Sequence, residues 1–295
     1  MKQWKGMGKM DEVDFYLKDL ESKFKKLDKS KYYLSYSGGK DSHFLYWFIK
    51  EYLKDNEIDI VGVNTYMEHP EIRDRILKNC DVVLYPKLKP FEIKQKYGSP
   101  CFSKIQDEFI KRYQSGNRSN NTLKYVLGNE KTMFKLNKKA KQLLLNNKLH
   151  KVSPLCCKYL KKEPAAVFQR KTGKHPILGV RGSESKLRGS KYKSCFTKDK
   201  KFTPLHDLSD ELLDMIYQKY KIETPRIYSV LSRTGCMGCP YGKNVELELS
   251  TLPNNQRNFV CRYFKESYEV LGVNTDKQIT IFDFIENEED QNDVD

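Results

Sequence analysis

The feature that most constrains this chain is an apolar strand that ends in a glycine-rich turn and continues directly into a helix. The strand is YYLSY at residues 32–36, and apolar residues resume in the helix that we expect over 41–53. The turn between them consists of Ser37, Gly38, Gly39, Lys40, Asp41 and Ser42. Glycines let successive N–H groups converge on one point, and a helix N-terminus adds partial positive charge there. The turn therefore predicts a phosphate or pyrophosphate site rather than an ordinary glycine-rich connection.

Strand-like and helix-like segments alternate through much of the chain. Strands are expected at Tyr32–Tyr36, Ile58–Tyr66, Asp81–Pro86 and Pro176–Gly182. Helices are expected at Val13–Leu27, Asp41–Leu53, Pro70–Cys80 and Leu208–Tyr220, the last with Ser209 as its cap. This alternation is typical of βαβ units. We therefore expect an α/β fold with a doubly wound, mostly parallel sheet and helices on both faces, plus a helical insert and a cysteine-bearing C-terminal region.

Changes in composition divide the chain into four parts. We expect an N-terminal helical segment at 1–30, a nucleotide-binding domain at 31–235, a cluster-binding region at 236–284 and an acidic, disordered tail at 285–295. The second part contains a basic helical insert over residues 111–151.

The chain is strongly basic, with 54 Lys and Arg against 39 Asp and Glu and a formal charge of +15. This balance indicates an anionic partner such as a nucleotide or a nucleic acid, although a generally lysine-rich surface gives the same count. The sequence has no run of 18 apolar residues, and its N-terminus is charged throughout. We therefore expect a cytoplasmic protein without a membrane partner.

Eight cysteines in a protein of the reducing cytoplasm predict catalysis, metal binding or free thiols rather than disulfides. Four of them form two pairs, Cys156 with Cys157 and Cys236 with Cys239. Four thiolates suit an iron–sulfur cluster or zinc, and thiol redox pairs are the third interpretation. Adjacent cysteines are unusual zinc ligands, which favours the cluster. Cys195 is a candidate substitute for one of the vicinal cysteines.

The motif SGGKDS resembles the signature of the PP-loop ATP pyrophosphatase superfamily, and other segments resemble its phosphoadenosine phosphosulfate (PAPS) reductase family. CCKYLKKEPA is similar to the CC…K-x-EP block of assimilatory adenylylsulfate reductases, and RTGCMGCPYG is similar to the RTGCxxCxxG block of many PAPS-reductase-like proteins. The resemblance extends from about Lys31 to Gly272. It implies an adenine nucleotide, ATP or PAPS, whose phosphates the turn binds with magnesium. Beside the nucleotide it implies a [4Fe-4S] cluster held by Cys156, Cys157, Cys236 and Cys239.

Two further segments resemble nucleotide-binding blocks of the same family. NTYMEHPE, at residues 64–71, is similar to DTG-x-E-x-PE: Thr65 and Glu68 fit, whereas the family's aspartate and glycine are replaced. GVRGSESKLR follows a predicted strand and resembles G-x-R-x-x-ES-x-x-R. Within it, Arg181 and Arg188 can each fork onto a phosphate or sulfate. The remaining nucleotide contacts expected in this block are Glu184 and Ser185.

The catalytic candidates are therefore Lys40, Asp41, Arg181 and Arg188. A conventional reductase of this family attacks sulfur with a cysteine in a C-terminal ECG-x-H motif. This sequence lacks that motif, and no cysteine follows Cys261. A conventional reductase mechanism is therefore not expected.

Three functions follow as hypotheses. The enzyme reduces a sulfonucleotide with Cys195, Cys261 or the thiol of a partner protein. Alternatively, it cleaves ATP to activate a nucleic acid that then accepts sulfur from a donor protein, as in DNA phosphorothioation or tRNA thiolation. The third hypothesis is a non-catalytic subunit that senses a nucleotide or a cluster.

Overall fold

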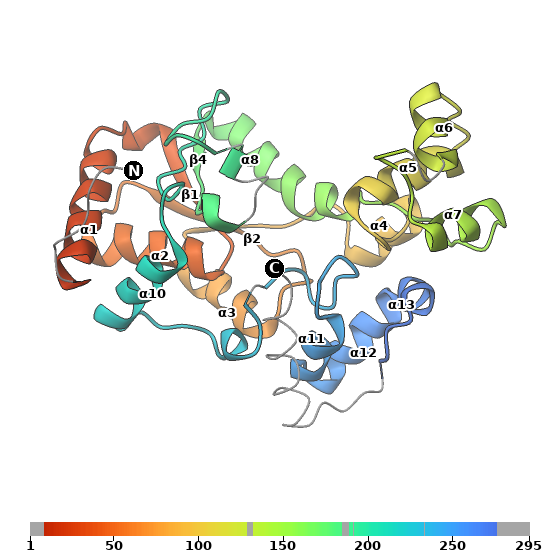
Figure 1. The fold of residues 1–295 in the computed structure, drawn as a ribbon. Helices are drawn as coiled ribbons and strands as arrows, with labels where there is room; N and C mark the ends of the chain where they lie inside the picture. Colours follow the sequence, from red (N-terminus) through yellow and green to blue (C-terminus); the bar gives the residue numbers. More distant parts are fainter. Residues whose placement is uncertain (1–8, 129–131, 185–188, 191, 233, 276–295) are drawn as a thin grey trace. The chain divides into compact units, whose positions relative to one another are not determined.

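A computed structural model describes residues 9–128, 132–184, 189–190, 192–232 and 234–275. The chain divides into two compact units, shown in the ribbon of Figure 1 and described one at a time. Unit 1 comprises Met1–Asn64, Pro70–Tyr85 and Pro164–Tyr228, and unit 2 comprises Thr65–His69, Pro86–Glu163 and Ser229–Asp295. This division cuts across the sequence-based domain at 31–235.

Unit 1 is built on a four-stranded parallel sheet with the order β3-β2-β1-β4. The strands are β1 (Tyr32–Tyr36), β2 (Asp59–Val63), β3 (Val82–Leu84) and β4 (His175–Ile177). All four expected strands are present, and those expected at 58–66, 81–86 and 176–182 are shorter than predicted. Because the neighbours are all parallel, the connections between them must cross over, and helices supply most of these crossovers.

Helices cover both faces of this sheet. Successive side chains of a strand point to opposite faces. The ring of Tyr33 packs at 5.0 Å on Phe168 of α8 (Glu163–Thr172), whereas the Tyr36 hydroxyl lies 2.8 Å from His43 of α2 (Lys40–Trp47). The predicted doubly wound α/β architecture is therefore confirmed.

The other helices of unit 1 follow the predicted segments closely. They are α1 (Lys9–Lys25), η2 (Phe48–Tyr52), α3 (Pro70–Asn79) and α10 (Asp210–Lys219), with short turns η1 (Lys29–Lys31), η4 (Gly182–Glu184) and η5 (Arg226–Ser229). The hydroxyl of Ser209 accepts a hydrogen bond from Leu212 N at 3.1 Å, which confirms it as the cap of α10. The helix expected over 41–53 changes to π-helical geometry at Phe48.

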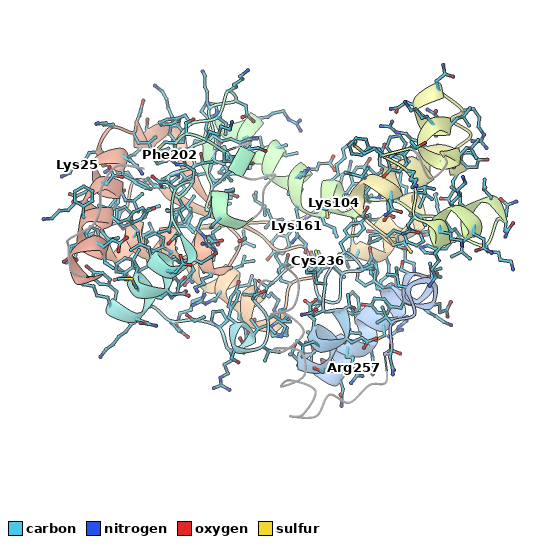
Figure 2. All side chains as sticks on the ribbon, viewed as in Figure 1. Lys25, Lys104, Lys161, Phe202, Cys236 and Arg257 are labelled. Carbon is cyan, nitrogen blue, oxygen red and sulfur yellow. The ribbon has the colours of Figure 1, made fainter. Side chains whose placement is uncertain are left out.

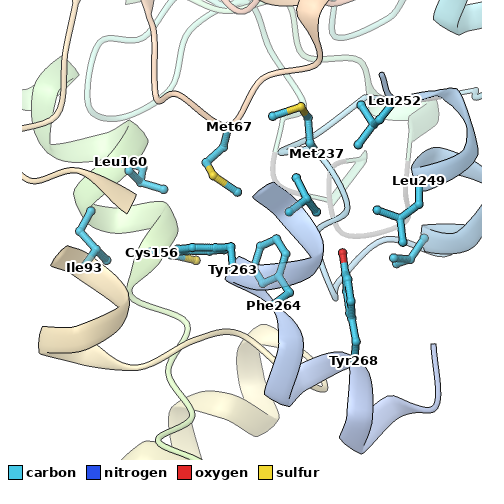
Figure 3. Packing of buried hydrophobic residues seen from close by; sticks show 12 residues of the cluster. Met67, Ile93, Cys156, Leu160, Met237, Leu249, Leu252, Tyr263, Phe264 and Tyr268 are labelled. Carbon is cyan, nitrogen blue, oxygen red and sulfur yellow. The ribbon is translucent and has the colours of Figure 1, made fainter. Parts of the chain in front are cut away.

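Unit 2 is helical and contains two apolar cores. Its helices are α4 (Pro90–Tyr97), α5 (Lys104–Gln114), α6 (Asn120–Leu127), α7 (Lys138–Leu145), η3 (Lys158–Lys162), α11 (Val245–Thr251), α12 (Asn254–Tyr263) and α13 (Lys265–Leu271). One core joins α5, α6 and α7 around Ile110, Val126 and Leu144. In the other, Cys156 packs with Met67, Tyr263 and other apolar side chains (Figure 3). In the part of the chain described here, no helix combines the length and apolarity needed to cross a membrane.

Candidate functional site

The glycine loop, Ser37–Ser42, begins where β1 ends and leads into α2. Gly38 has a φ of +74°, a backbone conformation that favours glycine. A Cβ atom at this position would lie 2.9 Å from Ile72 Cγ2 and 3.0 Å from the Ile72 carbonyl oxygen. Glycine is therefore required here both by the backbone angle and by the close approach of α3.

Two serine hydroxyls hold the loop closed. Ser42 Oγ accepts a hydrogen bond from Ser37 N at 3.2 Å and donates one to the Gly39 carbonyl oxygen at 3.0 Å. The two hydroxyl oxygens lie 3.0 Å from each other. Both predicted serines thus shape the loop, with Ser37 exposed and Ser42 buried.

The first turn of α2 lacks a side-chain cap, because its N-cap is Gly39. The first N–H groups of a helix have no partners inside the helix and must find them elsewhere. Lys40 N donates to the Tyr228 hydroxyl at 3.2 Å, and Tyr217 donates from its hydroxyl to the Lys40 carbonyl oxygen at 2.7 Å. These tyrosines hold the start of α2, whose uncapped N–H groups and dipole suit an anion.

The segment after β4 packs directly on the glycine loop. The chain leaves β1 for β2 and β3 on one side and returns to β4 on the other, so β1 and β4 flank a topological switch point of the sheet. Ligands of open α/β sheets bind at such points, beyond the carboxyl ends of the strands. A Cβ on Gly179 would lie 2.9 Å from both Asp41 C and Ser42 N. Only glycine permits this approach, and the sequence analysis missed its role.

Arg181 places its guanidinium against the loop, as its position after a strand predicted. It is buried and donates from Nε to Asp41 Oδ1 at 2.6 Å, and it also contacts Ser183 and Asp210. Burial by itself lowers the pKa of Arg181, but the carboxylates of Asp41 and Asp210 outweigh it and raise that pKa. The structure therefore joins two of the predicted catalytic residues in one ion pair.

Lys40 has a carboxylate partner too. Its ammonium group pairs with Asp214 and lies 5.5 Å from the centroid of the Tyr217 ring. Carboxylates such as Asp41 and Asp214 are the ligands that magnesium prefers. Among the described residues, however, no three His, Cys, Asp or Glu side chains are arranged to hold a metal ion.

Arg75, on α3, is a candidate that the sequence analysis missed. One terminal nitrogen donates to the Glu223 carbonyl oxygen, and the other is buried without a hydrogen-bond partner in the described chain. Burial lowers the pKa of His43 to about 3, and the charge of Arg75 acts in the same direction. Burial raises the pKa of Tyr36 to about 12, and the charge of Arg75 opposes this rise, so Arg75 acts on the neighbourhood of the loop. The helix that contains Arg75 was predicted from the sequence, but the surroundings of the Arg75 side chain depend on the fold.

Other predicted residues of the arginine block are placed only in part. Glu184 ends the short helix η4. Ser185 and Arg188 lie outside the described residues. Their expected contacts with a nucleotide therefore stay predictions.

Thr65 and Glu68 form a buried turn in unit 2. Thr65 donates to the Glu68 carboxylate from N at 2.9 Å and from Oγ1 at 2.6 Å. Glu68 forms an antiparallel bridge with Cys236, and Met237 N donates to the Met67 carbonyl oxygen at 2.6 Å. The structure thus brings these two residues, predicted to contact the nucleotide, together with the CxxC segment.

The four paired cysteines, here called the thiol cluster, all belong to unit 2, although among the described residues no three of them are arranged to hold a metal ion. All are free thiols, and the charges of Cys157, Cys236 and Cys239 all act on Cys156. A hydrogen bond from Cys156 lowers the pKa of Cys157 to about 6, and the nearby charges of Lys104, Lys161 and Lys162 act in the same direction. Burial raises the pKa of Cys236, and it raises that of Cys239 to about 12.

Lys161 interacts directly with the thiol cluster. Its ammonium group hydrogen-bonds to Cys236, and the charges of Cys236, Glu68 and Cys157 raise the pKa of Lys161. Figure 2 labels Lys161 and Cys236 together with Lys104. The lysine supplies positive charge where several thiolates would otherwise repel one another.

The CxxC loop is fixed by side chains from three helices. Gly238 has a φ of +56°, and a Cβ there would lie 2.4 Å from both the Tyr268 hydroxyl and Val260 Cγ1. Tyr268 donates to the Gly238 carbonyl oxygen, and Glu248 accepts from the Gly238 N–H. Burial raises the pKa of Glu248 to about 7. The loop is therefore held rigidly between α11, α12 and α13.

A buried carboxylate fixes the end of the same loop. Asp107 accepts hydrogen bonds from Cys101 N at 2.7 Å, Phe102 N at 3.0 Å and the Tyr241 hydroxyl at 2.6 Å. Burial raises the pKa of Asp107. Asp107 thereby ties the segment after Cys239 to the start of α5.

Cys195 has a different neighbour. It belongs to unit 1, where its sulfur lies 3.9 Å from His206 Nδ1. Burial raises its pKa. Cys261 lies on α12 in unit 2, partly buried against the second apolar core.

Comparisons with known proteins give similarity at the level of the fold. No family model matches the chain, and no curated protein matches its sequence. Among solved structures, PAPS reductase from Candida auris in a phosphate complex is 13% identical, with 78% of this chain and 96% of that chain covered and a TM-score of 0.40. The NH3-dependent NAD synthetase from Campylobacter jejuni is 16% identical, with 93% and 99% covered and a TM-score of 0.35.

Proposed function

We propose that this protein is an enzyme that binds an adenine nucleotide at the glycine loop and cleaves it there. The observation that supports this most is the meeting of two loops at the switch point of the sheet. Gly179 packs against the backbone of Asp41 and Ser42, and Arg181 pairs with Asp41. Backbone N–H groups, a helix N-terminus and two cations converge there, as the phosphates of a nucleotide require.

Each residue of this site has a proposed role. The N–H groups at the start of α2 bind phosphate oxygens, and Lys40 exchanges Asp214 for a phosphate as charge develops. Arg181 holds the Asp41 carboxylate in place. Arg75 offers a buried donor that has no partner within the described residues. Magnesium, if bound by the carboxylates here, would offset the charge of the phosphates.

We favour ATP as the nucleotide and adenylylation of a substrate oxygen as the reaction. The oxygen attacks the α-phosphorus, the bond between this phosphorus and the oxygen that bridges to the β-phosphorus breaks, and pyrophosphate leaves with the electron pair. The alternative is reduction of a sulfonucleotide, in which a thiolate attacks the sulfate sulfur, the nucleotide phosphate leaves and a second thiol releases sulfite. That route requires a thiol reductant, such as a partner protein.

We further propose that the thiol cluster binds a [4Fe-4S] cluster. Two segments supply the four thiols, of which Cys156 lies in an apolar core with Cys157 and Cys236 packed against it, and Lys161 offsets their charge. A single zinc ion needs all four sulfurs about 2.3 Å from one point, which suits adjacent cysteines poorly. A cubane binds each sulfur through a different iron, so its ligands stand further apart. When bound, such a cluster supplies electrons or sulfur.

Anaerobic purification followed by product analysis tests these proposals. Pyrophosphate release from ATP supports activation, and sulfite release from PAPS supports reduction. Iron and acid-labile sulfide should be present in wild type and absent from Cys236→Ser. If the purified protein binds ATP but forms neither product with any thiol donor, the enzyme hypothesis fails and the sensing subunit is favoured.

A further inference from the structure

The helical insert of unit 2 holds most of the excess positive charge of the chain. Residues 104–151 contain twelve Lys or Arg against three Asp or Glu, a formal charge of +9 out of +15. Two of these acidic side chains are already engaged, since Glu108 pairs with Lys111 and Arg112, and Asp107 is buried. The positive charge of the insert is therefore largely uncompensated.

Part of this charge gathers with apolar side chains in one patch. The insert patch consists of Lys104, Ile105, Met133, Phe134, Lys138 and Lys139. Asn137 N donates to the Gln106 side chain at 3.1 Å, which ties the start of α7 to the first turn of α5. Ile105 is 61% exposed, Met133 86% and Phe134 71%. Large apolar side chains that are this exposed among cations indicate a surface that binds a ligand or another macromolecule.

The lysines of the insert patch stand where a helix favours negative charge. Asn137 caps α7 by accepting from Ala140 N at 2.7 Å, and Lys138 and Lys139 follow in the first turn without any acidic residue. Lys104 begins α5 directly after its cap, Ser103. A cation at the positive end of a helix is unfavourable unless an anion compensates for it. Among the described residues none of these three lysines forms a salt bridge, so all three can interact with an external anion.

The ligand must be anionic and must also contact apolar rings. An acidic peptide would satisfy the lysines but would give Phe134 no flat partner. Single-stranded nucleic acids bind proteins through cations that follow the phosphates and aromatic rings on which unpaired bases stack. Lys104 is also near enough to Cys157 for its charge to act on that thiol. A strand on this surface therefore lies beside the thiol cluster.

We propose that the insert patch binds single-stranded nucleic acid, with its lysines on the phosphates and Phe134 stacked on a base. That this nucleic acid strand is also the acceptor of sulfur is an inference that rests on the proposed function. The binding of the strand can be tested without nucleotide turnover.

The test is fluorescence anisotropy of short labelled single-stranded DNA and RNA with the full chain, titrated at several salt concentrations. Phe134→Ala should weaken binding roughly tenfold, because base stacking contributes about 1–3 kcal/mol per base, while Phe134→Trp should retain it. Lys138→Ala with Lys139→Ala should reduce the log–log salt slope by about 1.4, since each phosphate contact on a single strand contributes about 0.7. Lys25→Glu with Lys26→Glu, at the C-terminal end of α1, is the control for a change of surface charge. This control variant should bind the nucleic acid more strongly than Lys138→Glu with Lys139→Glu.

Three results would overturn the inference. The first is that neither DNA nor RNA binds at low salt, and the second is that Phe134→Ala leaves the affinity unchanged. The third is that polyglutamate competes for the protein as well as a nucleic acid of equal charge does. Circular dichroism of each variant verifies that it folds. Lys40→Ala should bind the strand normally and lose nucleotide affinity. If it instead keeps its nucleotide affinity, only the proposed function is contradicted, and the inference about strand binding stands.

Discussion

The glycine loop of unit 1 and the thiol cluster of unit 2 are built in different ways. The loop presents backbone N–H groups, and its glycines exist to bring main chains together at Gly38 and Gly179. The thiol cluster presents side chains, and a rigid surrounding of helices fixes its CxxC segment at Gly238. A site formed by backbone N–H groups requires small residues where main chains approach each other. A site formed by side chains requires surrounding residues that fix the positions of those side chains.

This comparison teaches where each site is vulnerable. In unit 1 an added methyl group pushes apart the main chains that form the glycine loop and its surroundings. In unit 2 the same change displaces the loop that bears Cys236 and Cys239. The two sites should therefore fail separately, each through a single glycine.

The largest expected effect comes from this pair of glycines. Gly179→Ala should reduce nucleotide affinity by about a hundredfold or more, because its Cβ would overlap the backbone of the glycine loop. Its iron content should stay normal. Gly238→Ala should lose iron and keep nucleotide affinity, since its Cβ would overlap Tyr268 and Val260. Calorimetric titration and metal analysis of both variants provide the measurement, and a shared loss of both properties would refute separate sites.

A buried histidine should make unit 1 sensitive to acid. Burial lowers the pKa of His43 from 6.5 to about 3. The unfolded chain therefore takes up a proton first, and stability present above pH 6.5 is lost as the pH falls toward 3. The loss should approach roughly 5 kcal/mol by pH 3, since the shift of about 3.5 pKa units corresponds to 1.36 kcal/mol per unit. Denaturation of wild type and His43→Gln from pH 7 to pH 4 measures it, and parallel curves for the two proteins would contradict the assignment.

A buried carboxyl should make unit 2 respond in the opposite direction. Burial raises the pKa of Glu248 from 4.5 to about 7. Stability present below pH 4.5 is therefore lost as the pH rises toward 7, by roughly 3 kcal/mol. Glu248→Gln keeps an acceptor for the Gly238 N–H and removes this dependence. Unfolding of both proteins at pH 5 and pH 7.5 decides the matter, and the prediction fails if Glu248→Gln gains no stability relative to wild type at the higher pH.

The smallest effect is expected at Arg75. Its buried nitrogen should donate to a bound nucleotide, so Arg75→Ala should weaken ATP binding about tenfold, or about 1.4 kcal/mol. Arg73→Ala, on the same helix and exposed beside Asp74, is the matched control. Equal affinity of both variants for ATP would mean that Arg75 serves only the Glu223 carbonyl.

Much of unit 1 could be predicted from local sequence. The glycine loop, the parallel strands and the cap at Ser209 each depend on residues within one turn or one strand. The position of Arg181 followed from its place after a strand. These features are local, or they follow from the rule that parallel strands end at one edge of a sheet.

The contributions of Arg75, Gly179 and Tyr228 could not be predicted. Each depends on a contact between segments far apart in the sequence, such as Tyr228 with Lys40 N. No periodicity or spacing specifies such a partner. The bridge between Glu68 and Cys236 is another contact of this kind. That Thr65 and Glu68 contact a nucleotide stays a prediction.

Calorimetric titration of ATP, AMP and adenosine into wild type and Lys40→Ala tests the central claim most directly. If the glycine loop grips the phosphates, ATP should bind wild type at least tenfold more tightly than adenosine, and Lys40→Ala should lose most of that difference while its adenosine affinity stays the same. Equal affinities of wild type for ATP and adenosine would show that the loop is a structural turn and would contradict the account.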